Sequence, residues 1–261
     1  MRRVRKGSEP ICLAARRREL ERERRDTGRV VPSDWDKIGD CAKDVRAALV
    51  RDQDGLCAYC GRRLIRPPQD REEQPRESGP HDAAPGSVAH PPSGLNSYMK
   101  IEHFEARSIV PERMFDWDNL LGVCSGHFVI QGRVIETCDS ARGNRKLHVH
   151  PVTHPRDPTE LFPVHDGHLS DALGRPCLGA VIPHDKDADA IADTATLNLN
   201  ASPLIDDRAR VIRDLRVLLS RDDSLRAIRR LLDANTLVGS DGLPPYAHVA
   251  AAYLRKKLRA R

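Results

Sequence analysis

The sequence predicts an α+β protein in which helices flank a small mixed core. Apolar residues recur with helical spacing near both ends of the chain. Two groups of cysteines bracket its middle. A short segment with alternating apolar residues, between the two cysteines of the second group, is typical of a β-hairpin. The length of 261 residues suffices for one substantial domain or two small ones. We therefore expect a mainly helical protein with few strands.

The first part of the chain, residues 1–52, is expected to be a basic helical segment. Ser33 or Asp34 can cap a helix there. The apolar residues that follow would share one face of that helix: Trp35, Ile38, Ala42, Val45 and Leu49. Residues 1–30 hold 11 lysines and arginines against 5 acidic residues. This excess suits contact with nucleic-acid phosphates, and it equally suits a solvated helix with ion pairs four residues apart.

The middle of the chain divides into two regions of different composition. Residues 53–150 hold the motifs that carry chemistry. They are interrupted at 67–97 by a segment rich in Pro, Gly, Ser and acidic residues, which we expect to be a mobile insertion because it cannot bury enough apolar surface to fold. Residues 151–200 are loop-rich and contain several histidines.

The last region, residues 201–261, returns to helices. Three apolar stripes predict three of them: Val211, Ile212, Leu215, Leu218 and Leu219; Leu225, Ile228, Leu231 and Leu232; Val249, Tyr253 and Leu254. Asp223 or Ser224 can cap the second helix. Pro244 and Pro245 can open the third.

No run of roughly 18 apolar residues and no secretory pattern is seen, so we expect a cytoplasmic protein. In a reducing compartment, clustered cysteines indicate metal binding or catalysis rather than disulfides. Three of the seven cysteines, Cys12, Cys41 and Cys177, stand alone in the sequence. We expect these three to be small buried hydrophobic residues.

The other four cysteines predict a structural zinc site. Cys57 and Cys60 form a Cys-x-x-Cys-Gly knuckle, in which both thiolates can reach one Zn²⁺. Cys124 and Cys138 can complete a tetrahedral set, with His127 as a substitute for either. A redox pair is the alternative for the knuckle, but the βα turn that it requires is not evident.

The candidate catalytic residues lie between these cysteine groups and directly after Cys138. They occur in the segments Lys-Ile-Glu102-His103-Phe, Asp-Trp-Asp-Asn119-Leu-Leu and Cys-Asp139-Ser-Ala-Arg142-Gly. Taken singly, each has a plain structural reading, since Asn119 can end a turn and Asp139 can cap a helix. Taken together and in this order, the segments resemble the HNH endonuclease family, whose ββα-metal core holds one divalent cation against a histidine.

The resemblance implies a role for each of these residues. Glu102 and Asp139 would hold a catalytic Mg²⁺ or Mn²⁺ through oxygen atoms, and His103 would deprotonate the attacking water. Asn119 would bond the backbone and so hold the loop that carries the histidine. Arg142 would place a cation near the substrate phosphate, where lysine is usual in the family. Glu102 and Asp139 themselves depart from the commoner Asp and His or Asn.

A second departure from the family pattern is the spacing of the later cysteines. Thirteen residues separate Cys124 from Cys138, which leaves room for an inserted hairpin between Phe128 and Thr137. Its alternating apolar residues around a central glycine predict two short strands.

A closer resemblance extends over most of the chain, on the segments Lys6-Gly7…Pro10, Leu56-Cys-Ala-Tyr-Cys-Gly, Phe115-Asp-Trp-Asp-Asn-Leu-Leu and Thr196-Leu-Asn-Leu-Asn. Together with the Arg-rich helix from Arg208, these are similar to the HNH subunit family, PtuB, of Septu and retron-associated anti-phage systems. That resemblance implies a PtuA-like ATPase of the ABC/SMC kind as partner and, in retron systems, a reverse transcriptase.

Two other functions remain open at this point. One is a stand-alone restriction endonuclease of the McrA-like HNH kind, and the other is a non-catalytic, zinc-stabilised nucleic-acid-binding subunit. The substrate class, DNA or RNA, is not determined by an HNH site, which contacts the phosphate backbone. Of the histidines between residues 148 and 184, His148 is the first candidate for touching substrate or a second metal, although histidines in such loops are usually exposed turn residues.

Overall fold

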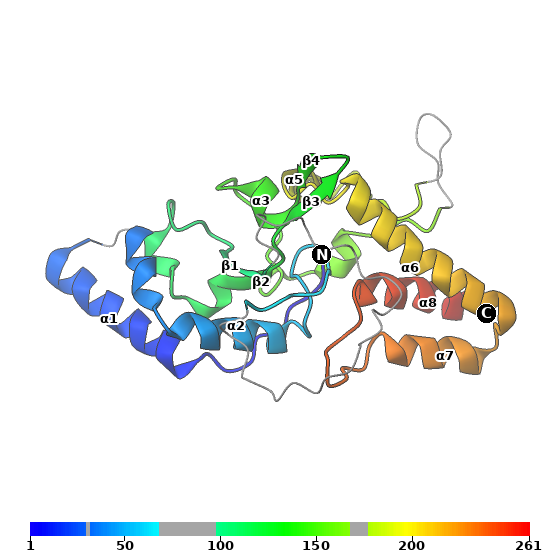
Figure 1. The fold of residues 1–261 in the computed structure, drawn as a ribbon, viewed down its shortest axis with the longest axis horizontal. Coiled ribbons are helices and arrows are strands. Elements are labelled where there is room, and N and C mark those ends of the chain that lie inside the picture. The colour runs from blue at the N-terminus through cyan, green and yellow to red at the C-terminus, as the bar shows by residue number, and fades with distance from the viewer. Residues whose placement is uncertain (30–31, 68–97, 168–176) are drawn as a thin grey trace.

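The computed structural model describes residues 1–29, 32–67, 98–167 and 177–261. The expected mobile insertion at 67–97 therefore lies outside the described residues, except for Pro67. The described elements run in this order (Figure 1): α1 (Ile11–Thr27), η1 (Pro32–Ile38), α2 (Cys41–Asp52), β1 (Lys100–His103), η3 (Pro111–Arg113), η4 (Trp117–Asn119), β2 (Leu120–Val123), β3 (His127–Ile130), β4 (Arg133–Glu136), α3 (Cys138–Arg142), α4 (Pro158–Leu161), α5 (Ala188–Thr196), α6 (Ser202–Arg221), α7 (Leu225–Ala234) and α8 (Ala247–Arg259).

The mixed class predicted from the sequence is confirmed, because helices flank two small antiparallel sheets. Figure 1 shows α1 and α2 at one end of the molecule, the strands and α3 in the middle, and α6, α7 and α8 gathered at the other end. The main hydrophobic core extends in sequence from Met1 to Leu204. A second core lies among α6, α7 and α8.

The β1–β2 pair is attached to α2 by a buried glutamine that follows the helix. The Gln53 side chain donates to the carbonyls of Leu56 and Gly122, and it accepts from the Gly122 amide at 2.7 Å. A Cβ at Gly122 would lie 3.1 Å from Leu64 Cδ1, so a glycine suits this close approach. Gln53 and Gly122 therefore set the position of β2 against α2.

The second sheet is the inserted hairpin. β3 and β4 pair with Phe128 opposite Ile135, and the turn residues Gln131 and Gly132 both have positive φ, 49° and 76°. Two successive residues with positive φ are characteristic of the tight hairpin turns that match strand twist. The predicted hairpin is confirmed.

The prediction of a single helix after Ser33 was wrong. The structure has the short 3₁₀ helix η1 and then the separate helix α2, with Gly39 at φ +48° between them. Glycine adopts this left-handed backbone without a Cβ clash, which allows the chain to leave one helix and begin another. Val45 and Leu49 of α2 are fully buried as expected, and Trp35, which belongs to η1, packs against the same core.

The C-terminal helices agree with the sequence prediction in most respects. The Ser224 hydroxyl accepts from the Ala227 amide and caps α7. Two residues of the predicted stripes face solvent instead, since Leu218 is 45% and Leu225 is 46% exposed. Arg208 is buried on α6 and donates to the carbonyls of Gly179 and Leu199, so its charge is used inside the protein.

None of the described helices has both the length and the apolar character that crossing a bilayer requires.

Candidate functional site

Four buried cysteine sulfurs lie together in the middle of the molecule. The Sγ–Sγ distances are 4.0 Å for Cys57 and Cys138, and 3.8 Å for both Cys60–Cys124 and Cys124–Cys138. A zinc ion with four Zn–S bonds of about 2.3 Å in a tetrahedron separates its sulfurs by about 3.8 Å. The four residues could thus hold a metal ion such as zinc, as the sequence predicted.

Local backbone structure brings the four sulfurs together. The knuckle closes where the Gly61 amide donates to the Cys57 carbonyl, and Gly61 has φ +82°. A Cβ on Gly61 would approach the His248 ring to 2.4 Å, so the residue after the knuckle has room only for glycine. Cys124 follows β2, and Cys138 begins α3 with its amide bonded to Leu197.

His127, considered as a substitute ligand, does not belong to this group. The mutually close ligand atoms come from the four cysteines, and His127 Nε2 lies 3.6 Å from the Glu136 carboxylate instead. Both residues belong to the inserted hairpin. The hairpin is therefore held between two ligands without supplying one itself.

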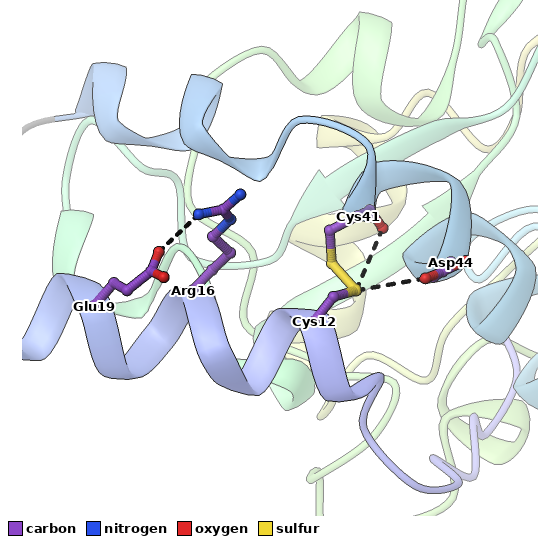
Figure 2. The surroundings of a disulfide bond; sticks show 5 residues. All are labelled: Cys12, Arg16, Glu19, Cys41 and Asp44. Atoms are coloured by element: carbon purple, nitrogen blue, oxygen red, sulfur yellow. Dashed lines mark hydrogen bonds and ion pairs between the residues drawn. A yellow bond between two sulfur atoms is a disulfide. The ribbon is translucent and has the colours of Figure 1, made fainter.

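The prediction for the remaining cysteines was wrong for two of them. Cys12 and Cys41 form a disulfide across 29 residues, with a Cα–Cα distance of 5.7 Å (Figure 2). No spacing motif marks this pair in the sequence, because it depends on how α1 packs on α2. Cys177 is outside any disulfide, and it is half-buried rather than fully buried.

Beside the cysteine cluster, two carboxylates from different elements face one another. Glu102 lies on β1 and Asp139 in the first turn of α3, within side-chain hydrogen-bonding reach. Burial raises the pKa of Glu102 to about 8; the Asp139 charge adds to this rise, and Arg142 opposes it. Two carboxylates in such proximity repel one another unless a proton or a cation lies between them.

Each carboxylate also has a basic neighbour. Arg142 donates to Glu102, and Lys100 Nζ lies 3.0 Å from Asp139 Oδ2. The Tyr59 hydroxyl donates to Glu102 at 3.3 Å. The sequence motifs did not single out Lys100 and Tyr59 for this role, although Lys100 lies two residues before Glu102 on the same face of β1.

His103 follows Glu102 directly and is nearly buried. Its Nε2 lies 3.0 Å from the Met114 carbonyl oxygen. A carbonyl can only accept, so Nε2 carries the proton in the neutral ring and Nδ1 keeps a lone pair. Burial lowers the pKa of His103 to about 4, so the imidazole is neutral near pH 7.

Trp35 covers His103, and sequence reasoning did not anticipate this contact. The two ring centroids are 4.4 Å apart at an interplanar angle of 84°, and Trp35 also stacks on Phe115 at 5.4 Å. The helical spacing of residues 35–49 had placed Trp35 on a core-facing stripe. The break at Gly39 reorients η1 so that Trp35 reaches the histidine.

Asn119 is fully buried and bonded to backbone on both sides of a loop. Its Oδ1 accepts from the Glu105 amide at 2.7 Å, and its Nδ2 donates to the carbonyls of Glu105 and Arg113 at 3.2 and 3.0 Å. These bonds close the loop between Glu105 and Arg113. Because Met114 follows that loop, Asn119 also fixes the carbonyl that holds the His103 ring.

The contacts of Arg142 differ from those of a phosphate-binding arginine on a protein surface. Its guanidinium is 2% exposed and donates to Glu102, to the carbonyls of His103 and Phe104, and through Nε to the Arg145 carbonyl. In this structure Arg142 therefore clamps α3 onto the end of β1. Its role toward a phosphate stays a prediction.

The candidate residues open onto one hollow of about 480 Å³. It is lined by Ser33, Asp36, Ile101, Glu102, His103, Ala106, Arg107, Ser108, Asp139, Arg142, Gly143 and Asn144. Four of the predicted site residues thus share one cavity, while Asn119 supports it from behind. Arg107, from the loop that Asn119 closes, lines the cavity and brings a further positive charge.

His148 lies elsewhere. Its Nδ1 and its amide both contact the Asp193 carboxylate at 3.1 Å, and Asp193 is fully buried on α5. These contacts attach the segment after α3 to α5, which is a structural task. They give no support to a role in binding substrate or a second metal.

Comparison with known proteins does not place the chain in a family. No protein-family model matches it, and no curated protein is significantly similar in sequence.

Proposed function

We propose that this chain is a metal-dependent HNH endonuclease that hydrolyses phosphodiester bonds in nucleic acid. The observation that carries the proposal is the convergence of Glu102, Asp139 and a neutral His103 on one cavity. A divalent cation held by the two carboxylates would offset charge on a phosphate oxygen and on the leaving 3′ oxygen. Glu102 and Asp139 offer the hard oxygen ligands that Mg²⁺ and Mn²⁺ prefer.

The remaining steps are assigned to the side chains of the chain itself. His103 accepts a proton from the attacking water at Nδ1, since its Nε2 is committed to the Met114 carbonyl. Asn119 keeps that carbonyl in place, and Arg142 orients Glu102. Arg107 is the cavity-lining cation that we assign to the substrate phosphate beside Arg142.

The cysteine cluster has a separate task in this proposal. Zinc held by four thiolates has no open coordination position, so it stabilises the fold and does no chemistry. It lies next to the site because Cys138 and Asp139 are consecutive residues of α3. The metal therefore fixes the helix that supplies one catalytic carboxylate.

One feature of the site favours a second function, that of a non-catalytic nucleic-acid-binding subunit. Glu102 and Asp139 each lie against a basic side chain, Arg142 and Lys100 respectively, so both carboxyl groups have a partner without a metal ion. A purely structural ion-pair network would have the same composition. Cation binding and turnover distinguish the two functions.

We also propose that the enzyme works with an ATPase partner of the PtuA kind, and in retron systems with a reverse transcriptase, as the sequence resemblance implies. A stand-alone nuclease of the McrA-like kind is the alternative. Purification with and without the product of the neighbouring gene separates these two: cleavage that needs no partner favours the stand-alone enzyme.

The test of the main proposal is cleavage of duplex DNA, single-stranded DNA and RNA with Mg²⁺ or Mn²⁺. We expect cation-dependent cleavage of one of these substrates, and a loss of about 10²–10⁴-fold in rate for His103→Ala. The matched control is His184→Ala, since His184 is exposed and is not among the residues that line the cavity. Equal rates for wild type and His103→Ala would refute the catalytic role. Nucleic-acid binding without any cleavage would support the non-catalytic function.

A further inference from the structure

The Cys12–Cys41 disulfide connects the starts of two helices. Cys12 lies in the first turn of α1, and Cys41 is the first residue of α2 (Figure 2). The chain between the two cysteines contains all of the remaining α1 and all of η1. The disulfide therefore closes a covalent loop that includes η1.

The loop closed in this way forms a wall of the candidate active site. Ser33 and Asp36 of η1 line the same cavity as Glu102 and His103. Between them Trp35 makes its edge-to-face contact with the His103 ring. Any change in how η1 is held reaches the histidine directly.

Most of the polar contacts of this loop lie at the surface. Only Leu13 and Leu20 are buried among the 17 residues of α1, and the Lys37–Glu23 ion pair between η1 and α1 is exposed and so contributes little. Ile38 of η1 is buried, and Trp35 packs on Phe115 and His103. The disulfide adds a covalent link to these contacts and so helps to keep α1 and η1 in position.

The disulfide is accessible from solvent on one side. A shallow hollow of about 580 Å³ is lined by Cys12, Ala15, Arg16, Glu19, Asp40, Cys41, Lys43 and Asp44. Cys41 is 7% exposed, whereas Cys12 is half-buried, so an attacking thiolate reaches Cys12 first. Figure 2 shows the Cys12 sulfur beside Asp44, and both residues line the hollow.

The surroundings also suit the reduced form. Cys12 Sγ lies 3.7 Å from Asp44 Oδ2 and 4.0 Å from the Cys41 carbonyl oxygen (Figure 2). A disulfide sulfur has no proton to donate to these acceptors, but a thiol does. The reduced Cys12 side chain would therefore find hydrogen-bond partners without rearrangement.

We propose that Cys12–Cys41 is a reversible thiol–disulfide site, with dithiols as its reductants, that controls how firmly η1 is held over His103. In the oxidised form η1 is fixed and the candidate site is assembled; in the reduced form η1 loosens and activity falls. The effect on activity rests on the nuclease function proposed above, whereas the effect on η1 does not.

The reaction is a two-electron exchange. One thiolate of the dithiol attacks Cys12 Sγ, the Cys12–Cys41 bond breaks, and Cys41 leaves as a thiolate that takes up a proton. The second thiolate of the reagent then attacks the reagent sulfur that is bonded to Cys12 Sγ. Cys12 is released as a thiolate and takes up a proton. The protein gains two thiols, and the dithiol becomes a disulfide.

The experiment compares full-length protein before and after dithiothreitol treatment with the double variant Cys12→Ser/Cys41→Ser, which needs no reductant. Alkylation after denaturation with chelator should count five thiols in the oxidised chain and seven after reduction. Hydrogen exchange within residues 32–38, at the amides of Ser33 to Ile38, should become roughly tenfold faster in both the reduced protein and the double variant, while β1 and β2 stay protected. Zinc content is measured in parallel, and Cys177→Ser should respond to dithiothreitol as the wild type does.

The outcomes separate this proposal from the nuclease proposal. Faster exchange at 32–38 together with a several-fold loss of cleavage supports both. Faster exchange in a protein that cleaves nothing supports the disulfide site and contradicts the nuclease. Seven thiols before reduction, or unchanged exchange at 32–38 in the double variant, would overturn the disulfide proposal whatever the cleavage assay shows.

Discussion

Two groups of potential metal ligands lie side by side in this molecule, and they differ in nearly every physical respect. The four cysteines are at most 5% exposed, and their sulfurs already have the spacing of a tetrahedral zinc site. The two carboxylates border an open hollow and are compensated by Arg142 and Lys100. A closed ligand set suits a permanent structural ion, whereas an open pair suits an ion that meets a substrate. The comparison predicts that changes at the first group affect folding and changes at the second affect function.

The largest effect is expected from removing the metal ion proposed for the cysteine cluster. Structural zinc contributes about 10–16 kcal/mol in small zinc domains, which is comparable to the total stability of about 5–15 kcal/mol of a typical domain. Chelation or Cys57→Ser should therefore unfold the core rather than lower its melting temperature by a few degrees. Circular dichroism and zinc content measure this, with Cys177→Ser as the control that keeps both. A Cys57→Ser protein that stays folded without zinc would contradict the comparison.

The second largest effect is expected from Asn119→Ala. The substitution leaves the Glu105 amide and carbonyl without a partner in a partly buried setting and removes one of the two donors to the Arg113 carbonyl, which costs about 3 kcal/mol. Because the loop holds the Met114 carbonyl, the cleavage rate should fall as well. Urea denaturation measures the loss of stability. Asn235→Ala, which removes a single bond at the end of α7, should cost about 1 kcal/mol or less.

At the carboxylate pair, the expected effect on stability is small and the effect on cation binding is large. Asp139→Asn removes a charge that repels Glu102 but also breaks the contact with Lys100, so unfolding free energy should change by no more than about 1 kcal/mol. Binding of Mn²⁺, measured by titration calorimetry, should weaken by at least about tenfold, since one of two ligands is lost. Asp36→Asn, in the same cavity but outside the pair, should bind Mn²⁺ normally. Unchanged Mn²⁺ binding in Asp139→Asn would remove the basis for the catalytic ion.

The smallest effect concerns pH. Burial lowers the pKa of His150 to about 4, and its ring packs on Phe104. The unfolded chain protonates this histidine near pH 6.5, so between about 6.5 and 4 the unfolded state binds more protons. Stability is therefore greatest above pH 6.5 and falls as the pH drops toward 4. Denaturation at pH 7 and pH 5 should show a smaller fall for His150→Gln than for wild type. An equal fall in both proteins would show that His150 does not contribute.

The cysteine cluster could be predicted from sequence because its ligands are few, chemically distinctive and arranged in a known spacing. Cys57 and Cys60 are three residues apart on a knuckle that is followed by Gly61, where a positive φ and the nearby His248 ring leave room only for glycine. The hairpin between Cys124 and Cys138 could also be predicted, since alternating apolar residues and a central glycine are local features of the sequence. The convergence of Glu102, His103 and Asp139 was implied by the resemblance of the ordered motifs to the HNH family.

What the sequence did not reveal depends on contacts between distant segments. Trp35 packs against the core as its stripe predicted, but its contact with His103 was not predicted, because helical spacing continues through Gly39 in the sequence although the helix does not. The disulfide joins residues that share no motif, and only the packing of α1 on α2 brings them together. Arg142 was expected to face a phosphate, and its position in the structure depends on the carbonyls at the end of β1. None of these contacts leaves a periodic signal in its own segment.

The separation of the zinc ligands along the chain has a consequence for how the protein folds. Cys57 and Cys60 meet at once, but Cys124 and Cys138 lie 64 and 81 residues away from their nearest partners in the knuckle. An ion bound early by the first two sulfurs gains its other two ligands only after the slow closure of these long loops. Once all four sulfurs are bound, the ion opposes the opening of all four segments at the same time. The ion should therefore slow unfolding far more than it accelerates folding, so the lifetime of the folded protein, more than its rate of formation, is expected to depend on zinc.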